Sequence, residues 1–236
     1  MSPANTLESP PRSQSIPKLR HGERLSRAEF ERRYETMPDV KAELLDGVVY
    51  MSSPVSVDHG SPHIDFGCWL ATYKAHTPGT DAGDNVTNRL SDESEPQPDA
   101  YLRILEAHGG NSYVDTDRYL AGAAELLGEV ARSSKSHDRT VKLPIYKRDG
   151  VREFILWRVE DNAIDWFVLR NDDYSPLVPD AAGIIHSETF PGLWLDVAAM
   201  VRRDLVQVLK VLQLGIDSTE HAEFVERLRR NAHKEQ

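Results

Sequence analysis

The sequence predicts a mixed α/β fold organised as a single domain. Helix-like and strand-like segments alternate along the chain, and the segment 125–131 is apolar on both of its alternating faces. A strand of this kind is covered on both sides, as in a central sheet flanked by helices. The 236 residues contain no internal repeat and no long linker, so we expect one domain over 22–236. Residues 1–21 begin with a Pro- and Ser-rich run without the apolar stretch of a signal peptide, which predicts a disordered arm.

The composition is that of an ordinary globular protein with an acidic net charge. Charged residues make up 28% of the chain, hydrophobic residues 39%, and the formal net charge is −10. These values are ordinary for a globular protein, and the acidic balance disfavours broad nucleic-acid binding while leaving room for a local basic cleft. Cys68 is the single cysteine, which excludes a disulfide framework and a cysteine-rich zinc site. The single cysteine fits a reducing setting, so we expect a cytoplasmic protein, and no apolar run approaches the roughly 20 residues that span a bilayer.

Capping and turn signals place the first elements. Ser26 followed by Glu29 has the spacing of a capping box and predicts a helix over 26–36. The pair Asp46-Gly47 lies between two apolar runs and predicts a hairpin over 42–51. The remaining elements of this half are a helix at 59–75, strands at 83–90 and 98–105, and a Gly-rich loop at 106–122.

The second half predicts the central strand and the elements that cover it. We expect a helix over 136–149 with Ser136 as its N-cap and Gly150 at its end, kinked by the internal Pro144. Strands at 152–159 and 163–170 form a hairpin, an irregular Pro- and Gly-rich stretch covers 171–191, and helices span 196–214 and 218–232.

Two acidic residues lie inside apolar, strand-like segments. Asp99 begins the strand at 98–105, and Glu129 lies within 125–131. Burying a carboxylate costs several kcal/mol unless a cation or strong donors meet it. Lys142 follows in the next predicted helix, and Glu43 lies at the foot of the first hairpin. Acids at the ends of neighbouring strands are a common way to hold an oxygen-liganded cation such as Mg²⁺, with Glu43 joining through a water.

Other interpretations of these residues stay open. Asp99 can begin a strand at the solvent edge, and Glu129 can form a structural ion pair with Lys142. His59 and His63 are four residues apart, but no Glu follows the first, so capping or packing is favoured over a zinc pair. The signatures of phosphate-binding loops, dinucleotide sites and nucleophile elbows are absent.

At these residues the chain resembles the Uma-two family of restriction endonucleases, within the PD-(D/E)XK nuclease superfamily. The matching pieces, in order, are AELLDGVVYM, SPVSVDHG, AGDNVTNRL, EPQPDAYLRI, GEVARSSKSHDRTVKL and VREFILWRVEDNAIDWFVLR, and the resemblance covers roughly 22–230. It implies a restriction-endonuclease-like core. It also implies that Asp99 is the Asp of the PD element and Glu129 the second acid. The superfamily's usual Lys position holds Ala131 here, and the resemblance implies a variant in which the Lys has moved to the next helix, as Lys142.

These observations lead to a metal-dependent DNA endonuclease as the expected function. Asp99 and Glu129 would ligate Mg²⁺ or Mn²⁺. Lys142 would position the attacking water or stabilise negative charge on the phosphate in the transition state, and Glu43 and His59 would assist. A non-catalytic binding or structural module with the same fold is the alternative, and a zinc hydrolase using His59 and His63 is a third. A homodimer is a further hypothesis, because cutting a duplex needs two centres and the C-terminal helices are amphipathic.

Overall fold

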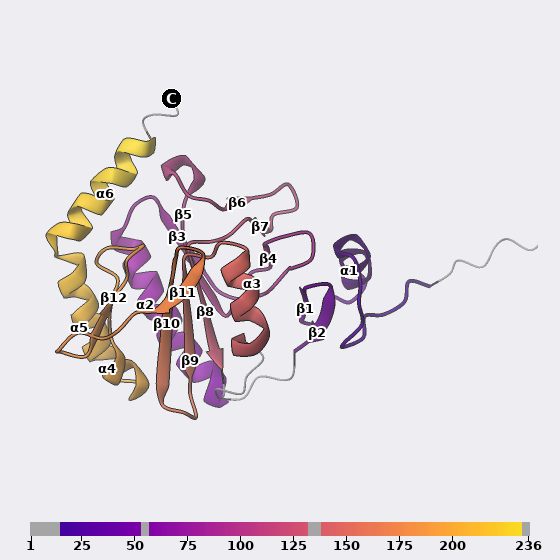
Figure 1. Ribbon diagram of the computed structural model, residues 1–236, viewed down its shortest axis with the longest axis horizontal. Coiled ribbons are helices and arrows are strands. Elements are labelled where there is room, and N and C mark those ends of the chain that lie inside the picture. The colour runs from indigo at the N-terminus through magenta and orange to yellow at the C-terminus, as the bar shows by residue number, and fades with distance from the viewer. Residues whose placement is uncertain (1–14, 53–56, 132–137, 233–236) are drawn as a thin grey trace, which may run out of the picture.

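The computed structural model describes residues 15–52, 57–131 and 138–232 (Figure 1). Most of the predicted N-terminal arm, and the predicted N-cap Ser136, lie outside these ranges. Within 15–21, the side chain of Leu19 is buried against the N-terminal hairpin. None of the described helices is both long and apolar enough to cross a bilayer.

A six-stranded mixed sheet forms the centre of the molecule. Its strand order is β11-β10-β9-β8-β5-β3. The pair β8–β9 is parallel and the other neighbours are antiparallel. The strands are β3 (Thr80–Gly83), β5 (Ala100–Ile104), β8 (Leu126–Ala131), β9 (Glu153–Arg158), β10 (Ala163–Arg170) and β11 (Asp173–Pro176). The segment predicted as the central strand is β8, which lies in the middle of the order.

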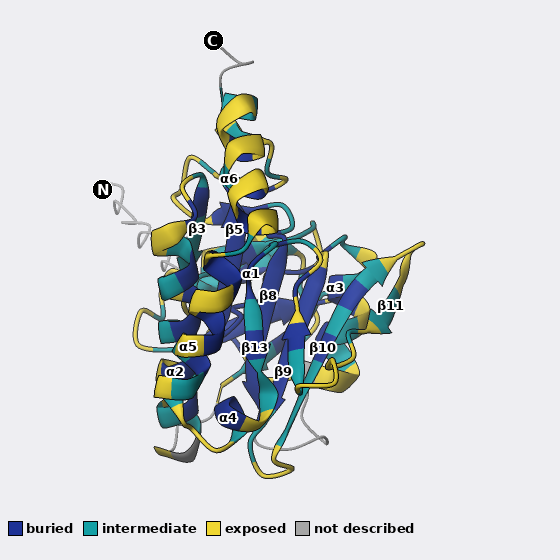
Figure 2. Ribbon diagram, turned by 90° about the vertical axis from the view of Figure 1, so that its left-hand side faces the viewer, coloured by how far each residue is buried: buried dark blue, intermediate teal, exposed yellow. Residues whose placement is uncertain are grey.

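Helices cover both faces of this sheet, and Figure 2 shows the buried strands that lie between them. The helices are α1 (Arg27–Tyr34), α2 (Val57–His76), α3 (Leu143–Arg148), α4 (Val197–Val201), α5 (Leu205–Ile216) and α6 (Thr219–Ala232). Leu126 and Val130 of β8 pack with α2, α4 and α5, whereas Leu127 and Ala131 pack with α3. This alternation confirms the predicted mixed α/β fold with a central sheet flanked by helices.

Short strands complete the architecture. They are β1 (Ala42–Leu45), β2 (Val48–Met51), β4 (Asn88–Arg89), β6 (Tyr113–Val114), β7 (Leu120–Ala121), β12 (Ile184–His186) and β13 (Trp194–Asp196). The β1–β2 hairpin turns at Asp46 and Gly47, whose φ angles of 50° and 73° are those of a type I′ turn. The predicted hairpin is therefore confirmed, as is the cap of α1, where the Ser26 hydroxyl accepts from the Glu29 amide.

Several predicted boundaries were wrong. The strand expected at 83–90 is divided into β3 and β4, because Asp84-Asn85 forms a turn with Asn85 at a φ of 52°. The helix expected at 196–214 is two helices, α4 and α5, separated by Arg203 at a φ of 62°. Asp204 then caps α5 by accepting from the Gln207 amide. The stretches 106–122 and 171–191, expected to be irregular, contain the short strands β6, β7 and β12 and the edge strand β11.

The connection from β8 to β9 also differs from the expected helix. A π-helical turn, Asp138–Lys142, leads directly into α3. Pro144 therefore lies in the first turn of α3, where its missing N–H has no helical partner to lose. Asp149 is the C-cap, and Gly150 follows it at a φ of 84°. The crossover delivers Lys142 and Tyr146 to the face of β8 that carries Glu129.

The absence of a side chain at Gly128 allows α2 to pack closely against β8. A Cβ atom added at Gly128 would lie 2.3 Å from Cε1 of Phe66, which is itself buried in α2. We expect Gly128→Ala to lower the free energy of unfolding by about 1–3 kcal/mol, because the surrounding core leaves Phe66 little room to move. Urea denaturation measures this, with Gly60→Ala as the control, since nothing lies within 4 Å of a Cβ added there. Equal stability of Gly128→Ala and the wild type would contradict the packing described.

Glu95 makes stability depend on pH. Its side chain is buried, and burial together with the neighbouring Glu31 raises the pKa of Glu95 from 4.5 to about 8. The folded chain therefore holds a proton that the unfolded chain loses, and the free energy of unfolding falls as pH rises through this window. We expect Glu95→Gln to flatten that fall in urea denaturation between about pH 5 and about pH 8. An unchanged slope would show that Glu95 is already ionised in the folded protein.

Candidate active site

Neighbouring strands bring Asp99 and Glu129 together. Strands β5 and β8 pair antiparallel with Ala100 opposite Gly128, so the same register carried one residue further places Asp99 opposite Glu129. The amide of Val130 donates to Asp99 Oδ2 at 2.8 Å. Both carboxylates are buried, with 7% of Asp99 and 3% of Glu129 exposed. The two acids that the sequence singles out are thus adjacent at one end of the sheet.

Lys142 joins Glu129 and Glu43 into one buried cluster. Its Nζ lies 2.9 Å from Glu129 Oε1 and 2.8 Å from Glu43 Oε1. The hydroxyl of Tyr146 donates to the same Glu129 oxygen at 2.8 Å. Lys142 and Tyr146 share a face, as their spacing predicts, while the side chain of Asp138 lies outside the part described. The lysine is held by two carboxylates from β1 and β8, which fixes its position.

Glu43 contacts Lys142 directly, and its predicted contact with a cation through a water stays a prediction. It is carried by β1, and its Oε1 also accepts from the amide of Gln97 at 2.6 Å. Gln97 lies two residues before Asp99 in the chain. The N-terminal hairpin therefore docks on the segment that leads into β5, and its acid helps to build the cluster.

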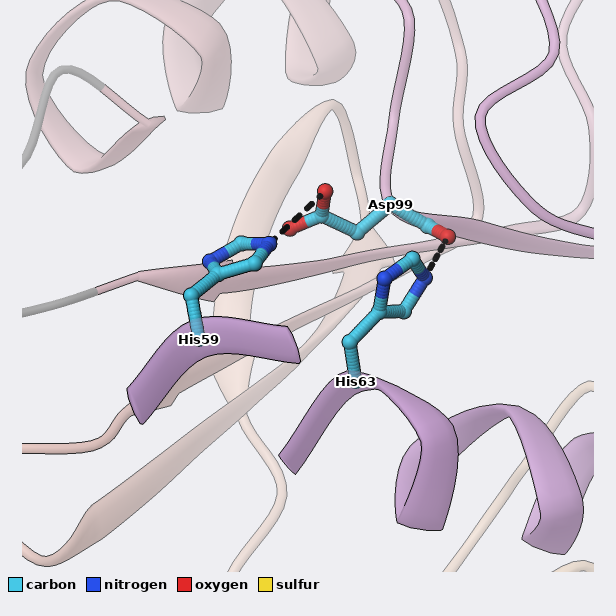
Figure 3. Close-up of side chains that lie close together, drawn as sticks. All are labelled: His59, His63 and Asp99. Atoms are coloured by element: carbon cyan, nitrogen blue, oxygen red, sulfur yellow. Dashed lines mark hydrogen bonds and ion pairs between the residues drawn. The ribbon is translucent and has the colours of Figure 1, made fainter. Parts of the chain in front are cut away.

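His59 and His63 approach Asp99 from α2 (Figure 3). His59 Nε2 lies 3.5 Å from Asp99 Oδ1, and His63 Nε2 lies 2.7 Å from the Asp99 carbonyl oxygen. The sequence predicted capping or packing roles for the two histidines and did not indicate that both rings contact Asp99. The signal was present in the four-residue spacing of the histidines, which puts them on one helix face.

The contacts between Asp99 and its neighbours shift the pKa values of Asp99 and His59. Burial alone would raise the pKa of Asp99, but the hydrogen bonds with His59 and the Val130 amide hold it below its usual value. In turn the hydrogen bond with Asp99 raises the pKa of His59. Asp99 is therefore kept ionised despite its burial, as a metal ligand must be.

The donor chemistry of the cluster fits a divalent cation. Asp99 and Glu129 offer carboxylate oxygens on adjacent strands, the ligands that Mg²⁺ and Mn²⁺ prefer. The carboxylate of Asp99, with Oδ2 tied to the backbone and Oδ1 turned toward His59, is oriented from two sides. All five predicted site residues, Asp99, Glu129, Lys142, Glu43 and His59, belong to this neighbourhood, and Tyr146 is the member that sequence reasoning did not assign.

Comparison with known families identifies the family to which the chain belongs. A sequence model described as "Uma2: Putative restriction endonuclease" matches residues 27–198, which is more than half of the chain. The chain belongs to this family. The six-stranded sheet, helices α1 to α3 and the acid cluster of this Uma2 protein lie within the matched region, whereas α5 and α6 follow it.

A solved structure has the same fold as this Uma2 protein. It is a protein of Anabaena variabilis ATCC 29413 described as "a putative nuclease belonging to DUF820". The TM-score is 0.51 at 12% identity, and the match covers 72% of this chain and 97% of the other. At that identity the likeness concerns the fold alone. No curated protein matches the chain. The family match and the shared fold agree on a restriction-endonuclease-like architecture.

Proposed function

We propose that this Uma2 protein hydrolyses phosphodiester bonds of DNA with Mg²⁺ or Mn²⁺ held by Asp99 and Glu129. The observation that carries the proposal is the convergence of these two strand-borne acids with Lys142. When bound, such a cation supplies a polarised phosphoryl oxygen and an activated water. The family to which the chain belongs supports a nucleic-acid substrate, and a divalent cation together with Lys142 would balance the negative charges of Asp99, Glu129 and Glu43.

The residues around the two acids have separate tasks in this proposal. Lys142 presents a positive charge where negative charge accumulates on the phosphate in the transition state. Glu43 holds that ammonium group in place, and Tyr146 orients Glu129 through its 2.8 Å hydrogen bond. His59 assists by orienting Asp99, whose Oδ1 lies 3.5 Å from His59 Nε2, and by keeping that carboxylate ionised.

Cleavage of supercoiled plasmid and of single-stranded DNA tests the proposal. The purified chain is incubated with each DNA in Mg²⁺ or Mn²⁺, and with a chelator as the blank. We expect metal-dependent cutting of at least one of the two. Absence of cutting by a chain that still binds Mn²⁺ would favour the alternative, a binding module that keeps the nuclease fold.

A homodimer would place two such centres on one duplex, and we propose it as the assembly that makes double-strand breaks. Light scattering of the full chain at micromolar concentration tests this. A monomer under those conditions would remove the dimer and leave a nicking activity.

A further inference from the structure

A second set of donors surrounds Asp99 on the side of α2. His59, His63 and Asp99 each offer one ligand atom, and these atoms all lie within 4.8 Å of one another. Glu129 and Lys142 take no part in this group. Two imidazoles and a carboxylate form a different donor set from the paired carboxylates of the proposed Mg²⁺ or Mn²⁺ position.

The hydrogen bond of His63 prepares its ring for metal binding. A carbonyl oxygen only accepts, so the His63 Nε2 that lies 2.7 Å from the Asp99 carbonyl carries the proton. In the neutral ring Nδ1 then has a free lone pair, and in Figure 3 this nitrogen lies on the side of His59 and the Asp99 carboxylate. Metal-binding histidines typically donate their other N–H to a carbonyl or carboxylate in this way.

The spacing of His59 and Asp99 is that of two ligands of one ion. Their facing atoms, Nε2 and Oδ1, are 3.5 Å apart. Two ligands at about 2.1 Å from a tetrahedral Zn²⁺ are separated by about 3.4 Å. The other separations in the group are at most 4.8 Å, so side-chain movements of about 1–1.5 Å would bring all three atoms to this spacing.

Ions and water can reach this group. His59 retains 28% side-chain exposure. His63 lines an open, mainly apolar hollow of about 440 Å³ that runs along α2 beside Ile64, Gly67 and Ala82. Three protein ligands with a solvent-facing side leave room for a fourth, exchangeable ligand.

We infer that His59, His63 and Asp99 form a binding site for a transition-metal ion of the Zn²⁺, Co²⁺ or Ni²⁺ type. Imidazole nitrogen favours these ions over Mg²⁺, which prefers oxygen. The inference meets the proposed function at Asp99, which both positions share, and at His59, which the proposed function uses to orient Asp99. Binding at the histidine site does not require that the protein cut DNA.

Titration of the full-length wild-type chain with Co²⁺, without DNA, tests the site. We expect visible d–d absorption that saturates at one Co²⁺ per chain, is removed by added Zn²⁺, and persists in excess Mg²⁺. His63→Ala is expected to weaken Co²⁺ binding at least about tenfold. His63→Gln, whose amide nitrogen reaches the position of Nε2 and can still donate to the Asp99 carbonyl, is expected to fold normally and to lose the same affinity. Glu129→Gln is expected to keep the spectrum.

His76→Ala is the matched control, because His76 is an exposed histidine at the end of the same helix. It should bind Co²⁺ as the wild type does. Absence of d–d absorption at stoichiometric Co²⁺, or an unchanged spectrum in both His63 variants, would overturn the inference. Metal-dependent DNA cleavage alongside such a result would leave the proposed function standing, and Co²⁺ binding without cleavage would support the histidine site alone.

Discussion

Lys142→Met is expected to lower the free energy of unfolding by about 3–5 kcal/mol. Lys142 is 3% exposed, and its ammonium group contacts the buried carboxylates of Glu43 and Glu129. Methionine keeps most of the volume but deprives both acids of this cation, and the desolvation penalty of the acids remains. Urea denaturation at neutral pH measures the loss.

Two further variants separate this charge effect from loss of packing. Lys147→Met, in the same helix, removes a surface ion pair with Asp173 and should cost less than about 1 kcal/mol. Adding Glu129→Gln to Lys142→Met should recover part of the loss, because one buried charge disappears. A Lys142→Met protein as stable as the wild type would show that the three charged groups are not coupled as described.

Glu129→Gln is expected to reduce metal-dependent DNA cleavage by about a hundredfold to a thousandfold while the protein stays folded. Glutamine has the size of glutamate and can still accept from Tyr146 and Lys142, but it is a poor ligand for Mg²⁺. Lys142 also keeps its contact with Glu43. Initial rates of plasmid nicking, with thermal melting of the same preparations, measure both properties.

Glu106→Gln provides the matched control for that comparison. Glu106 is exposed and follows the end of β5 opposite to Asp99, about 20 Å away by strand geometry. It should cut DNA as fast as the wild type. Equal rates for Glu129→Gln and Glu106→Gln would remove Glu129 from the metal site.

The centre of the fold could be predicted because its sequence signals are local and strong. The strand with Glu129 is apolar on both faces, a pattern typical of a strand that is covered on both sides. The turn at Asp46-Gly47 and the cap at Ser26 are equally local. Asp99 and Glu129 were expected to meet because both lie in neighbouring buried strands, and the β5–β8 register brings them together.

Other features depend on contacts between distant segments and could not be read from the chain. Glu43 contacts Lys142, 99 residues away in the sequence numbering, only because the N-terminal hairpin docks on the segment before β5. The role of His63 depends on the carbonyl of Asp99, which no side-chain pattern reveals. The break between α4 and α5 occurs at a non-glycine residue with positive φ, Arg203, which propensity does not anticipate.

The most direct test of the central claim, that Asp99, Glu129 and Lys142 form one hydrolytic centre, is the rate of DNA cleavage by Asp99→Asn. Wild type, Asp99→Asn and Glu106→Gln are compared in Mn²⁺ on the DNA form that the wild type cuts, after melting curves show that all three are folded. We predict that Glu106→Gln cuts at the wild-type rate and that Asp99→Asn falls by at least about a hundredfold. Cleavage by folded Asp99→Asn at the wild-type rate would contradict the account and place the chemistry elsewhere.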